Sequence, residues 1–424
     1  MSQIINNVSR DRSLQSPRLR QLQTELASGT PAILAKFWRE IEEHQSPLIE
    51  PLPHGREALV TFLWRGDDSL ENVVVFSSLT GWNFEHNQLT SLPHSDVWYG
   101  TYPAPLDLRA TYWVSPNDSL AAPQEVEDWT LRTTGWQRDP LNRKTYRDLW
   151  YTEEEPTEKI ISVLELPEAP PQPWVLQRPG VSAGTVVEHT VRSRILGNER
   201  KVWVYTPAGY TTSSQECDAL VVFDGHAYTH LIPTPTILDN LIVEGRIPPV
   251  VAIMPDNMAS TREQELTCSP KFVDFLAEEL LPWARTLYRV TNDPARTIVA
   301  GSSYGGLAAA FASMTRPDVF GNVLSQSGSF WWKPETDKEF EWTAHQFSEK
   351  PLLPLHFYLD VGTLETDGPP NGPSQIECNR HLRDSLEAKG YPVHYAEFIG
   401  GHDTLCWQGT LADGLQALLG TTSE

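Results

Sequence analysis

The pattern of hydrophobic and polar positions changes along the chain and predicts two kinds of architecture. Between about residues 52 and 115, short segments alternate apolar and polar positions and are rich in aromatic and β-branched side chains. Gly, Asn, Asp and Pro separate these segments, which is typical of short strands joined by tight turns. We therefore predict a β-sandwich-like region, with Trp82 and Trp98 at turn or strand-edge positions.

Helical spacing precedes the predicted strands. Residues 17–44 carry apolar side chains at intervals of three and four positions, namely Leu19, Leu22, Leu26, Leu34, Phe37 and Ile41. After the strands comes a Pro- and Glu-rich stretch, and such a composition cannot build a core. We predict a smaller N-terminal domain over residues 1–160, a linker over 161–180 and a larger domain over 181–424.

Beyond about residue 185, continuous apolar runs alternate with helical segments. Apolar strands are predicted to begin near residues 201, 219, 249, 296, 354 and 392. Such runs are expected of strands that helices cover on both faces. The alternation predicts an α/β fold whose mostly parallel sheet is flanked by helices. Pro282 lies inside a helical pattern, so we expect a kink or an end there.

The strongest local motif is Gly301-Ser302-Ser303-Tyr304-Gly305, which follows the strand-like RTIVA and precedes the helix-like LAAAFASM. In α/β-hydrolases, a G-x-S-x-G motif in this setting places a nucleophilic serine on a strained turn, where glycines permit close backbone approach. We therefore predict an α/β-hydrolase with Ser303 as nucleophile. Ser302 is the competing hydroxyl, but it is not centred between the glycines.

A serine hydroxyl needs an adjacent base to attack an ester near neutral pH. His402 follows the last predicted strand, which is where this fold carries its histidine, and a double glycine precedes it. A carboxylate after the preceding strand should orient the imidazole. Glu365 is the preferred candidate because it lies beyond the strand. Asp360 and Asp367 remain alternatives, as does a dyad without a third member.

An oxyanion hole normally combines the backbone N–H after the nucleophile with one from a loop that follows an earlier strand. The first donor would be the N–H of Tyr304. The second would come from Gly225 or His226, in the loop after the apolar run ALVVF. A simple strand-ending turn is the alternative interpretation of this loop.

Ordered motifs extend along nearly the whole chain. The first region contains FLWRG, LTGWN, DVWYGTY and DPLNRKTY, and the second contains VVFDGHAY, REQEL, VAGSSYGGLAA, LSQSGSFWW, LDVGTLE and GGHDTLCW. From about residue 50 to 415 the chain resembles the ferric enterobactin (enterochelin) esterases, within the esterase D-like α/β-hydrolases. The resemblance implies a cytoplasmic serine esterase that hydrolyses the trilactone esters of ferric enterobactin, or a related catecholate siderophore, to dihydroxybenzoylserine units and so aids iron release.

The resemblance also implies Arg262 as a substrate contact and Trp331 and Trp332 as lining of the pocket. A ferric tris-catecholate is anionic and exposes aromatic faces, so cationic and flat apolar side chains suit it. The structural alternatives are that Arg262 only pairs with Glu265 and that the tryptophans fill the core. One departure is Ser269, where the resemblance leads us to expect an asparagine.

Composition and charge narrow the possible partners. The chain has 55 acidic and 33 basic residues, and its formal charge of −22 disfavours nucleic acid. No apolar run suits a signal peptide or a membrane span, so we expect a cytoplasmic protein. The four cysteines are widely spaced, which argues against zinc and against disulfides. We expect no metal or other cofactor, and the oligomeric state stays open.

Two rival functions remain. The first is a carbohydrate esterase of the feruloyl or acetyl type, whose N-terminal domain would be a sugar-binding module; the missing signal peptide argues against it. The second is a catalytically inactive siderophore-binding protein, against which the intact serine, histidine and acid argue. For the siderophore esterase, we expect the tryptophan-rich N-terminal domain to cap the site and to contribute substrate contacts.

Overall fold

The computed structural model describes residues 14–29, 32–53, 55–81, 86–121, 126, 128–151, 156–257 and 260–420. The chain forms two compact units. The first comprises Met1–Asp148 with Lys159–Pro170, and the second comprises Leu149–Glu158 with Pro171–Glu424. Within the described ranges, no helix is long and apolar enough to span a membrane. Trp82 lies outside the described residues.

Two four-stranded sheets, in the orders β1-β2-β5-β4 and β3-β6-β8-β7, form the β-sandwich-like part. The strands are β1 (Leu48–Pro51), β2 (Glu57–Arg65), β3 (Val73–Ser77), β4 (Thr90–Ser91), β5 (Val97–Pro105), β6 (Arg109–Pro116), β7 (Thr145–Tyr151) and β8 (Pro156–Glu165). Neighbours such as β2 and β5, or β3 and β6, run antiparallel. Phe62 of β2 contacts Tyr112 of β6, with ring centroids 4.9 Å apart, so apolar side chains join the two sheets.

The helical spacing over residues 17–44 belongs to two helices, α1 (Pro17–Leu26) and α2 (Ala32–His44). These helices pack on the face of the β1-β2-β5-β4 sheet that points away from the β3-β6-β8-β7 sheet. Leu63 of β2 contacts the helices, whereas its neighbour Phe62 points toward Tyr112 of β6. A short helix, α3 (Trp129–Thr133), follows β6. The predicted linker begins too early, because residues 161–165 belong to β8.

The second unit contains an eight-stranded sheet in the order β16-β15-β14-β13-β11-β12-β10-β9. The strands are β9 (Thr185–Arg192), β10 (Glu199–Thr206), β11 (Asp218–Val222), β12 (Val250–Pro255), β13 (Thr297–Ser302), β14 (Asn322–Gln326), β15 (His356–Gly362) and β16 (Val393–Phe398). In sheet order from β16 to β12 all pairs are parallel. At the other end of the sheet, β10 pairs antiparallel with β12, and β9 pairs antiparallel with β10. This mostly parallel sheet confirms the predicted α/β class. Sequence reasoning missed β9, an edge strand in which Val191 is buried and most other side chains are exposed.

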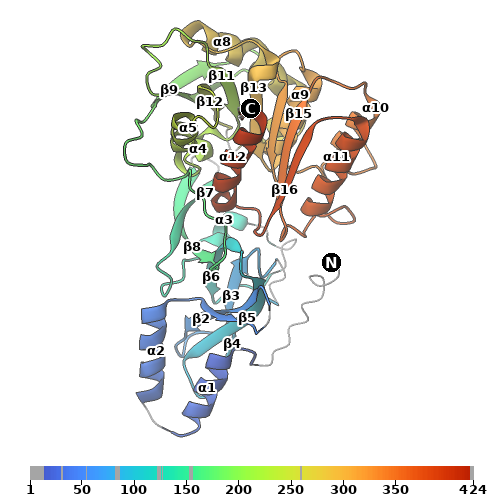
Figure 1. Ribbon diagram of the computed structural model, residues 1–424. Coiled ribbons are helices and arrows are strands. Elements are labelled where there is room, and N and C mark those ends of the chain that lie inside the picture. The colour runs from blue at the N-terminus through green and yellow to red at the C-terminus, as the bar shows by residue number, and fades with distance from the viewer. Residues whose placement is uncertain are drawn as a thin grey trace. The chain divides into compact units, whose positions relative to one another are not determined.

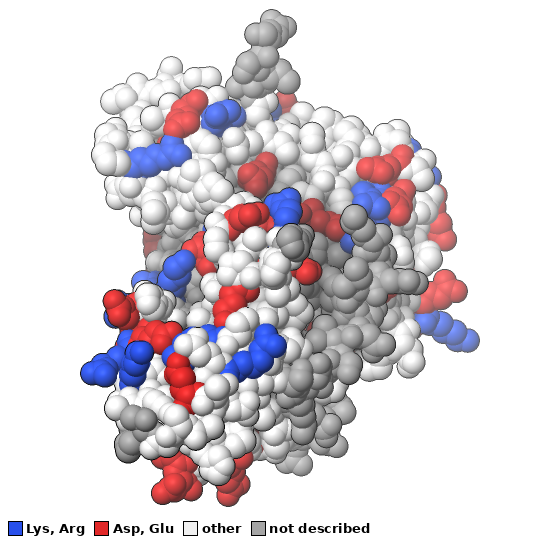
Figure 2. Space-filling view, turned by 60° about the horizontal axis from the view of Figure 1, so that its bottom comes forward, with Lys and Arg blue, Asp and Glu red and all other residues white. Residues whose placement is uncertain are grey.

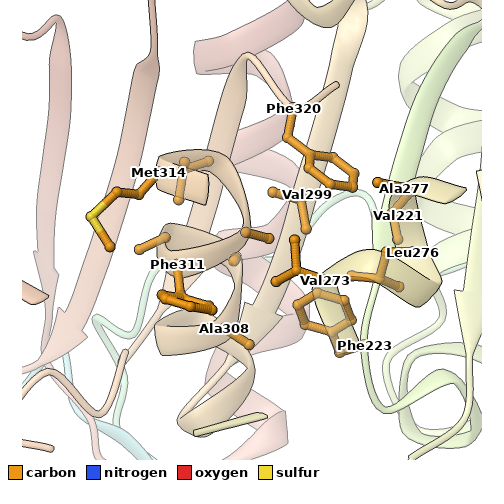
Figure 3. Packing of buried hydrophobic residues seen from close by; sticks show 14 of the residues in the cluster. Val221, Phe223, Val273, Leu276, Ala277, Val299, Ala308, Phe311, Met314 and Phe320 are labelled. Carbon is orange, nitrogen blue, oxygen red and sulfur yellow. The ribbon is translucent and has the colours of Figure 1, made fainter. Parts of the chain in front are cut away.

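Helices cover both faces of this sheet (Figure 1). One face carries α4 (Gly225–His230), α5 (Thr234–Val243) and α12 (Thr404–Leu419). The other carries α6 (Arg262–Leu266), α7 (Pro270–Asp274), a π-helical turn (Phe275–Leu280), α8 (Leu281–Leu287), α9 (Tyr304–Thr315), α10 (Trp342–Glu349) and α11 (Gln375–Lys389). Strand residues alternate between the two layers: Val221 and Val299 belong to the same buried cluster as Phe311 of α9 (Figure 3), whereas Leu220 packs on the opposite face.

Pro282 does not end the helical stretch that contains it. The chain winds through α7 and the π-helical turn into α8, and Pro282 occupies the first turn of α8. A proline fits there because the first residues of a helix need no N–H donor. Ser269, where an asparagine was expected, caps α7 by accepting a hydrogen bond from the N–H of Phe272 at 3.4 Å.

Acidic and basic side chains are intermingled on the face shown in Figure 2. In the first unit, Arg65 pairs with Asp96 and Lys144 pairs with Glu165, each at 2.8 Å. Exposed pairs of this kind contribute about 0–1 kcal/mol each. They balance the acidic excess locally, and the apolar clusters hold the fold.

A buried ion pair lies between the eight-stranded sheet and the helices that cover it. Arg200 of β10 donates to both carboxylate oxygens of Glu265 on α6, at 2.6 and 3.0 Å. The Arg200 side chain is 0% exposed, and its guanidinium lies 4.9 Å from the ring centroid of Phe275. Asn257 also donates to Glu265, at 2.9 Å. Glu265 therefore neutralises a cation that has no access to solvent.

Glu265→Ala should lower the free energy of unfolding by about 3–5 kcal/mol, because it leaves the Arg200 charge buried without its counter-charge. Urea unfolding followed by tryptophan fluorescence measures this loss. Glu216→Ala is the control, since Glu216 pairs with Arg296 at the surface and its side chain is 53% exposed. The control should change stability by less than about 1 kcal/mol. Equal effects of the two substitutions would contradict the prediction.

Candidate active site

Ser303 lies on the turn between β13 and α9, at φ 59° and ψ −123°. Residues other than glycine seldom adopt a positive φ, and such strain clusters at functional turns. The N–H of Ser303 donates to the carbonyl of Gln326 at 2.9 Å, and its carbonyl accepts from the N–H of Ser329 at 3.0 Å. These bonds tie the turn to β14 and to the loop that follows it.

Close backbone packing requires glycine at this turn, although not at both expected positions. A Cβ on Gly301 would lie 2.7 Å from the carbonyl carbon of Gly305. A Cβ on Gly305 would meet nothing closer than 3.8 Å, whereas one on Gly306 would lie 2.3 Å from Ser325 Oγ. Gly306, outside the G-x-S-x-G motif, therefore carries the second steric requirement.

Glu365 and His402 come together in the structure. The Nδ1–H of His402 donates to Glu365 Oε2 at 2.6 Å. Glu365 follows β15 and its side chain is 2% exposed, whereas His402 follows β16 and is 41% exposed. The N–H of Gly362 donates to the other carboxylate oxygen at 2.8 Å. With Nδ1 bonded to the carboxylate, Nε2 is the nitrogen that can accept a proton from a serine.

Asp360 and Asp367, the alternative carboxylates, lie elsewhere; of the described carboxylates, Glu365 is the one hydrogen-bonded to His402. Asp360 is fully buried within β15. Burial raises the pKa of Asp360 to about 8, and the nearby carboxylates of Glu365 and Asp413 add to the rise. Asp360 is therefore largely protonated at neutral pH. Asp367 is exposed to solvent.

The hydroxyl of Ser303 is hydrogen-bonded to that of Ser329, with the two Oγ atoms 3.3 Å apart. Ser303 and His402 follow β13 and β16, and the four parallel strands β13 to β16 are consecutive in the sheet. Their carboxyl ends meet at one edge, which brings serine, acid and histidine to the same side. Catalytic hydrogen bonds often tighten only when substrate binds, so the contact with Ser329 describes a resting arrangement.

Two helix N-termini supply the candidate oxyanion donors. Tyr304 and Gly225 are the first residues of α9 and α4, so their N–H groups have no carbonyl one turn earlier in the helix. The N–H of His226 donates instead to Asp256 Oδ1 at 3.3 Å. Gly225 is therefore better suited than His226 to act with Tyr304.

Arg262 does not pair with Glu265. Its Nε and Nη2 donate to the two carboxylate oxygens of Asp224, each at 2.7 Å, and Glu265 pairs with Arg200 instead. Asp224 is buried and adopts a left-handed conformation, at φ 54°, directly before Gly225. The bidentate pair balances part of the charge of Arg262 and fixes its orientation beside the candidate oxyanion loop.

Trp331 and Trp332 are half-buried and have different neighbours. The ring of Trp331 lies 5.8 Å from the ring of Tyr304, and its Nε1–H donates to Gln375 Oε1 at 2.7 Å. Trp332 makes an edge contact with Trp342 at 6.1 Å. Trp331 is thus beside the nucleophile turn, whereas Trp332 packs toward α10.

Sequence reasoning did not single out Asp224, Ser327 or Ser329. Ser327 and Ser329 belong to the segment SQSGSFWW, which begins in β14. Ligands of open parallel sheets bind outside the carboxyl ends of the strands. Small polar residues at such an end were the available signal. Their contacts depend on the turn that follows, which pattern alone does not specify.

Two family models match the chain. The model described as putative esterase matches residues 193–418, and the model described as enterochelin esterase, N-terminal, matches residues 59–175. The iron(III) enterobactin esterase of Dickeya dadantii is 31% identical over 93% of this chain and 95% of that protein. The chain belongs to the enterobactin esterase family. It is therefore a carboxylic ester hydrolase.

Further members of the enterobactin esterase family match at similar levels. The iron(III) salmochelin esterase of Escherichia coli is 29% identical over 94% of this chain and 97% of that protein. The crystal structure of the enterobactin esterase of Shigella flexneri, determined in the presence of enterobactin, matches with a TM-score of 0.72 and 28% identity. That match covers 90% of this chain and 97% of the crystallised one. The predicted α/β-hydrolase fold with a smaller N-terminal β-region is confirmed.

Asp360→Asn should make the stability of this family member less dependent on pH. A carboxyl group whose pKa is raised by folding contributes fully below its unfolded pKa of 3.8, and the contribution is lost as the pH rises through about 8. Asparagine has no proton to lose. The difference in Tm between variant and parent should therefore be more favourable to the variant at pH 8.5 than at pH 5.5. Each kcal/mol of difference in the free energy of unfolding corresponds to roughly 2–4 °C in Tm.

Ester hydrolysis should persist in Asp360→Asn, since Glu365 is the carboxylate bonded to the imidazole. Asp384→Asn, at an exposed position on α11, is the control and should leave the pH dependence of Tm unchanged. A Tm difference that is the same at both pH values, or a loss of turnover as large as that of Glu365→Gln, would contradict this interpretation.

Proposed function

We propose that this enzyme hydrolyses the trilactone ester bonds of ferric enterobactin, or of a related catecholate siderophore, to dihydroxybenzoylserine units in the cytoplasm, and thereby aids iron release. The observation that carries the proposal is that an enterobactin esterase matches this chain over 93% of its length, through both units. The carboxyl edge of the sheet adds Ser303 and a bonded His402–Glu365 pair.

The rival functions are less well supported. A sugar-binding module would be expected at the N-terminus of a carbohydrate esterase, but residues 59–175 match the enterochelin esterase N-terminal model. An inactive binding protein would have no use for a strained serine at the same sheet edge as a histidine–carboxylate pair, since strain of this kind costs roughly 1–3 kcal/mol.

In the proposed mechanism, Ser303 Oγ attacks a lactone carbonyl while His402 Nε2 takes the hydroxyl proton. Glu365 stabilises the imidazolium through Nδ1–H. The N–H groups of Tyr304 and Gly225 bind the oxyanion of the tetrahedral intermediate. When the ester C–O bond breaks, His402 returns the proton to the leaving serine hydroxyl of the siderophore. Water then attacks the acyl-enzyme with His402 as base, which frees the carboxylate product and Ser303.

The side chains around the nucleophile suit an anionic, aromatic substrate. Tyr304 and Trp331 offer ring faces beside Ser303. Catechol rings pack well against such faces. We propose Arg262, held by Asp224, as the cation that meets the siderophore charge. Trp332, which follows Trp331 in the loop after β14, is a further candidate for substrate contact. We propose the N-terminal unit as a second source of substrate contacts, with Trp98 of β5, which is partly exposed, as the first candidate.

Ser303→Ala should leave a folded protein that has lost up to about 10⁶-fold in turnover. Glu365→Gln should lower turnover strongly as well, because the imidazole loses its carboxylate partner. Chromatography of dihydroxybenzoylserine monomer, dimer and trimer, released from ferric and iron-free enterobactin, measures both. A fluorophosphonate probe should label the parent at Ser303 but not the alanine variant. Turnover near that of the parent in Ser303→Ala would refute the nucleophile assignment.

Arg262→Ala should lower kcat/KM for ferric enterobactin by roughly 10- to 100-fold, the usual range for a hydrogen bond to a charged group. A neutral nitrophenyl ester should be affected much less, and the difference should shrink with added salt. Arg316→Ala, which removes a surface arginine paired with Asp318, is the matched control. Equal losses on the two substrates would indicate that Arg262 acts only through Asp224. The same comparison with Trp98→Ala tests the N-terminal unit.

A further inference from the structure

Two residues outside the proposed triad close a ring of contacts with its acid and base. Ser327 Oγ donates to Glu365 Oε1 at 2.6 Å, and the Nε1–H of Trp407 donates to Ser327 Oγ at 3.0 Å. The ring of Trp407 lies edge-on to the imidazole of His402, with centroids 4.8 Å apart and planes at 84°. The fourth side of this ring is the 2.6 Å hydrogen bond between His402 and Glu365.

The hydrogen-bond directions in this ring follow from the chemistry of its members. An indole N–H only donates, so Ser327 Oγ must accept from Trp407. The single hydroxyl hydrogen of Ser327 is then directed to Glu365 Oε1, which also accepts the N–H of Gly362. The arrangement therefore gives Oε1 two donors and leaves Oε2 to His402.

The backbone keeps Ser327 where these bonds need it. Ser327 is fully buried and adopts a left-handed conformation, at φ 47°. Its N–H donates to the carbonyl of Asp360 at 2.8 Å, and the side-chain amide of Gln375 donates to the carbonyls of Ser327 and Gly328. A non-glycine residue at positive φ is uncommon, and here two neighbouring elements hold it.

We propose that Ser327 and Trp407 are positioning residues of the hydrolase, which lock the Glu365 carboxylate and the His402 imidazole into one unit. The inference rests on the proposed Ser303–His402–Glu365 triad. Glu365 Oε1 receives the N–H of Gly362 and the hydroxyl of Ser327, so the carboxylate cannot rotate and Oε2 faces Nδ1. The anchored indole limits tilting of the imidazole.

This role differs from a merely structural one in what it predicts for the kinetics. If the ring only satisfies buried polar atoms, its loss lowers the fraction of folded enzyme and leaves the folded molecules fully active. If it positions the acid and base, folded molecules lose kcat, because a small misplacement of reacting groups can cost as much as 10²-fold in rate. Substrate binding, and with it KM, should change little.

The experiment uses four variants of the full chain. Ser327→Gly removes the hydroxyl and accepts the positive φ, and Trp407→Phe keeps a ring against His402 but removes the indole donor. Asn371→Gly relieves a left-handed residue, at φ 62°, in an exposed loop. Trp283→Phe removes an indole that lies edge-on to His189 at 5.1 Å and 80°, the same geometry away from the site.

We expect Ser327→Gly and Trp407→Phe each to lower kcat on a nitrophenyl ester by about 10- to 100-fold, with KM within about threefold of the parent. Labelling of Ser303 by a fluorophosphonate should slow in parallel. Because the two residues act through one ring, the double variant should lose little more than the worse single variant. Both controls should keep the parental kcat.

Rates are expressed per folded molecule, from circular dichroism and active-site titration. Parental kcat per folded molecule in the two test variants, or strictly additive losses in the double variant, would overturn the inference while leaving the triad intact. If Ser327→Gly does not fold, Trp407→Phe decides by the same criterion. Activity surviving in Ser303→Ala and Glu365→Gln would instead show that the proposed triad itself is wrong.

Discussion

The positive φ of Ser303 depends on close packing at two neighbouring glycines, where there is no room for a side chain. Gly301 touches the start of α9, and Gly306 lies against the strand and loop of β14, where Cβ atoms would overlap their neighbours. The strained turn costs roughly 1–3 kcal/mol. Burial of α9 offsets this cost, because one buried side chain such as Leu307 contributes about 1.5–3 kcal/mol. The nucleophile is therefore held by the core of the hydrolase unit.

Charge is organised locally around this turn, against the acidic character of the whole chain. A protein with formal charge −22 repels an anionic substrate at long range. Arg262 forms a bidentate ion pair with Asp224, which fixes the direction of its guanidinium group. Recognition of a siderophore near Ser303 would then depend on short-range contacts, among them the ring faces of Tyr304 and Trp331. Such contacts select for shape as well as for charge.

The sequence predicted those parts of the molecule that local chemistry determines. Apolar runs located the strands that lead to Ser303, Glu365 and His402, because buried parallel strands leave a continuous hydrophobic signal. The same signal failed for β9, whose side chains are largely exposed. The change of winding before Pro282 also escaped prediction, since a π-helical turn and an α-helix have similar apolar spacing.

Long-range pairing escaped the sequence for a different reason. Spacing offered Glu265, three positions away, as the alternative partner of Arg262, but in the tertiary fold Arg262 pairs with Asp224, which is 38 positions distant. The choice among Asp360, Glu365 and Asp367 likewise needed the loop after β15. Residues that contact each other across strands, such as Ser327 and Trp407, leave no periodic trace.

The buried thiol of Cys378 can report on local opening of the helix that supports the site. Its thiol is fully buried in α11, where burial raises the thiol pKa well above its usual range, and it donates to the carbonyl of Gln375 at 3.1 Å. Gln375 is the residue that also holds Trp331 and the carbonyl of Ser327. An alkylating reagent can reach this buried thiol only when α11 separates from that loop. The rate at which Cys378 is alkylated therefore reports how often α11 separates from the loop that carries Ser327 and Trp331.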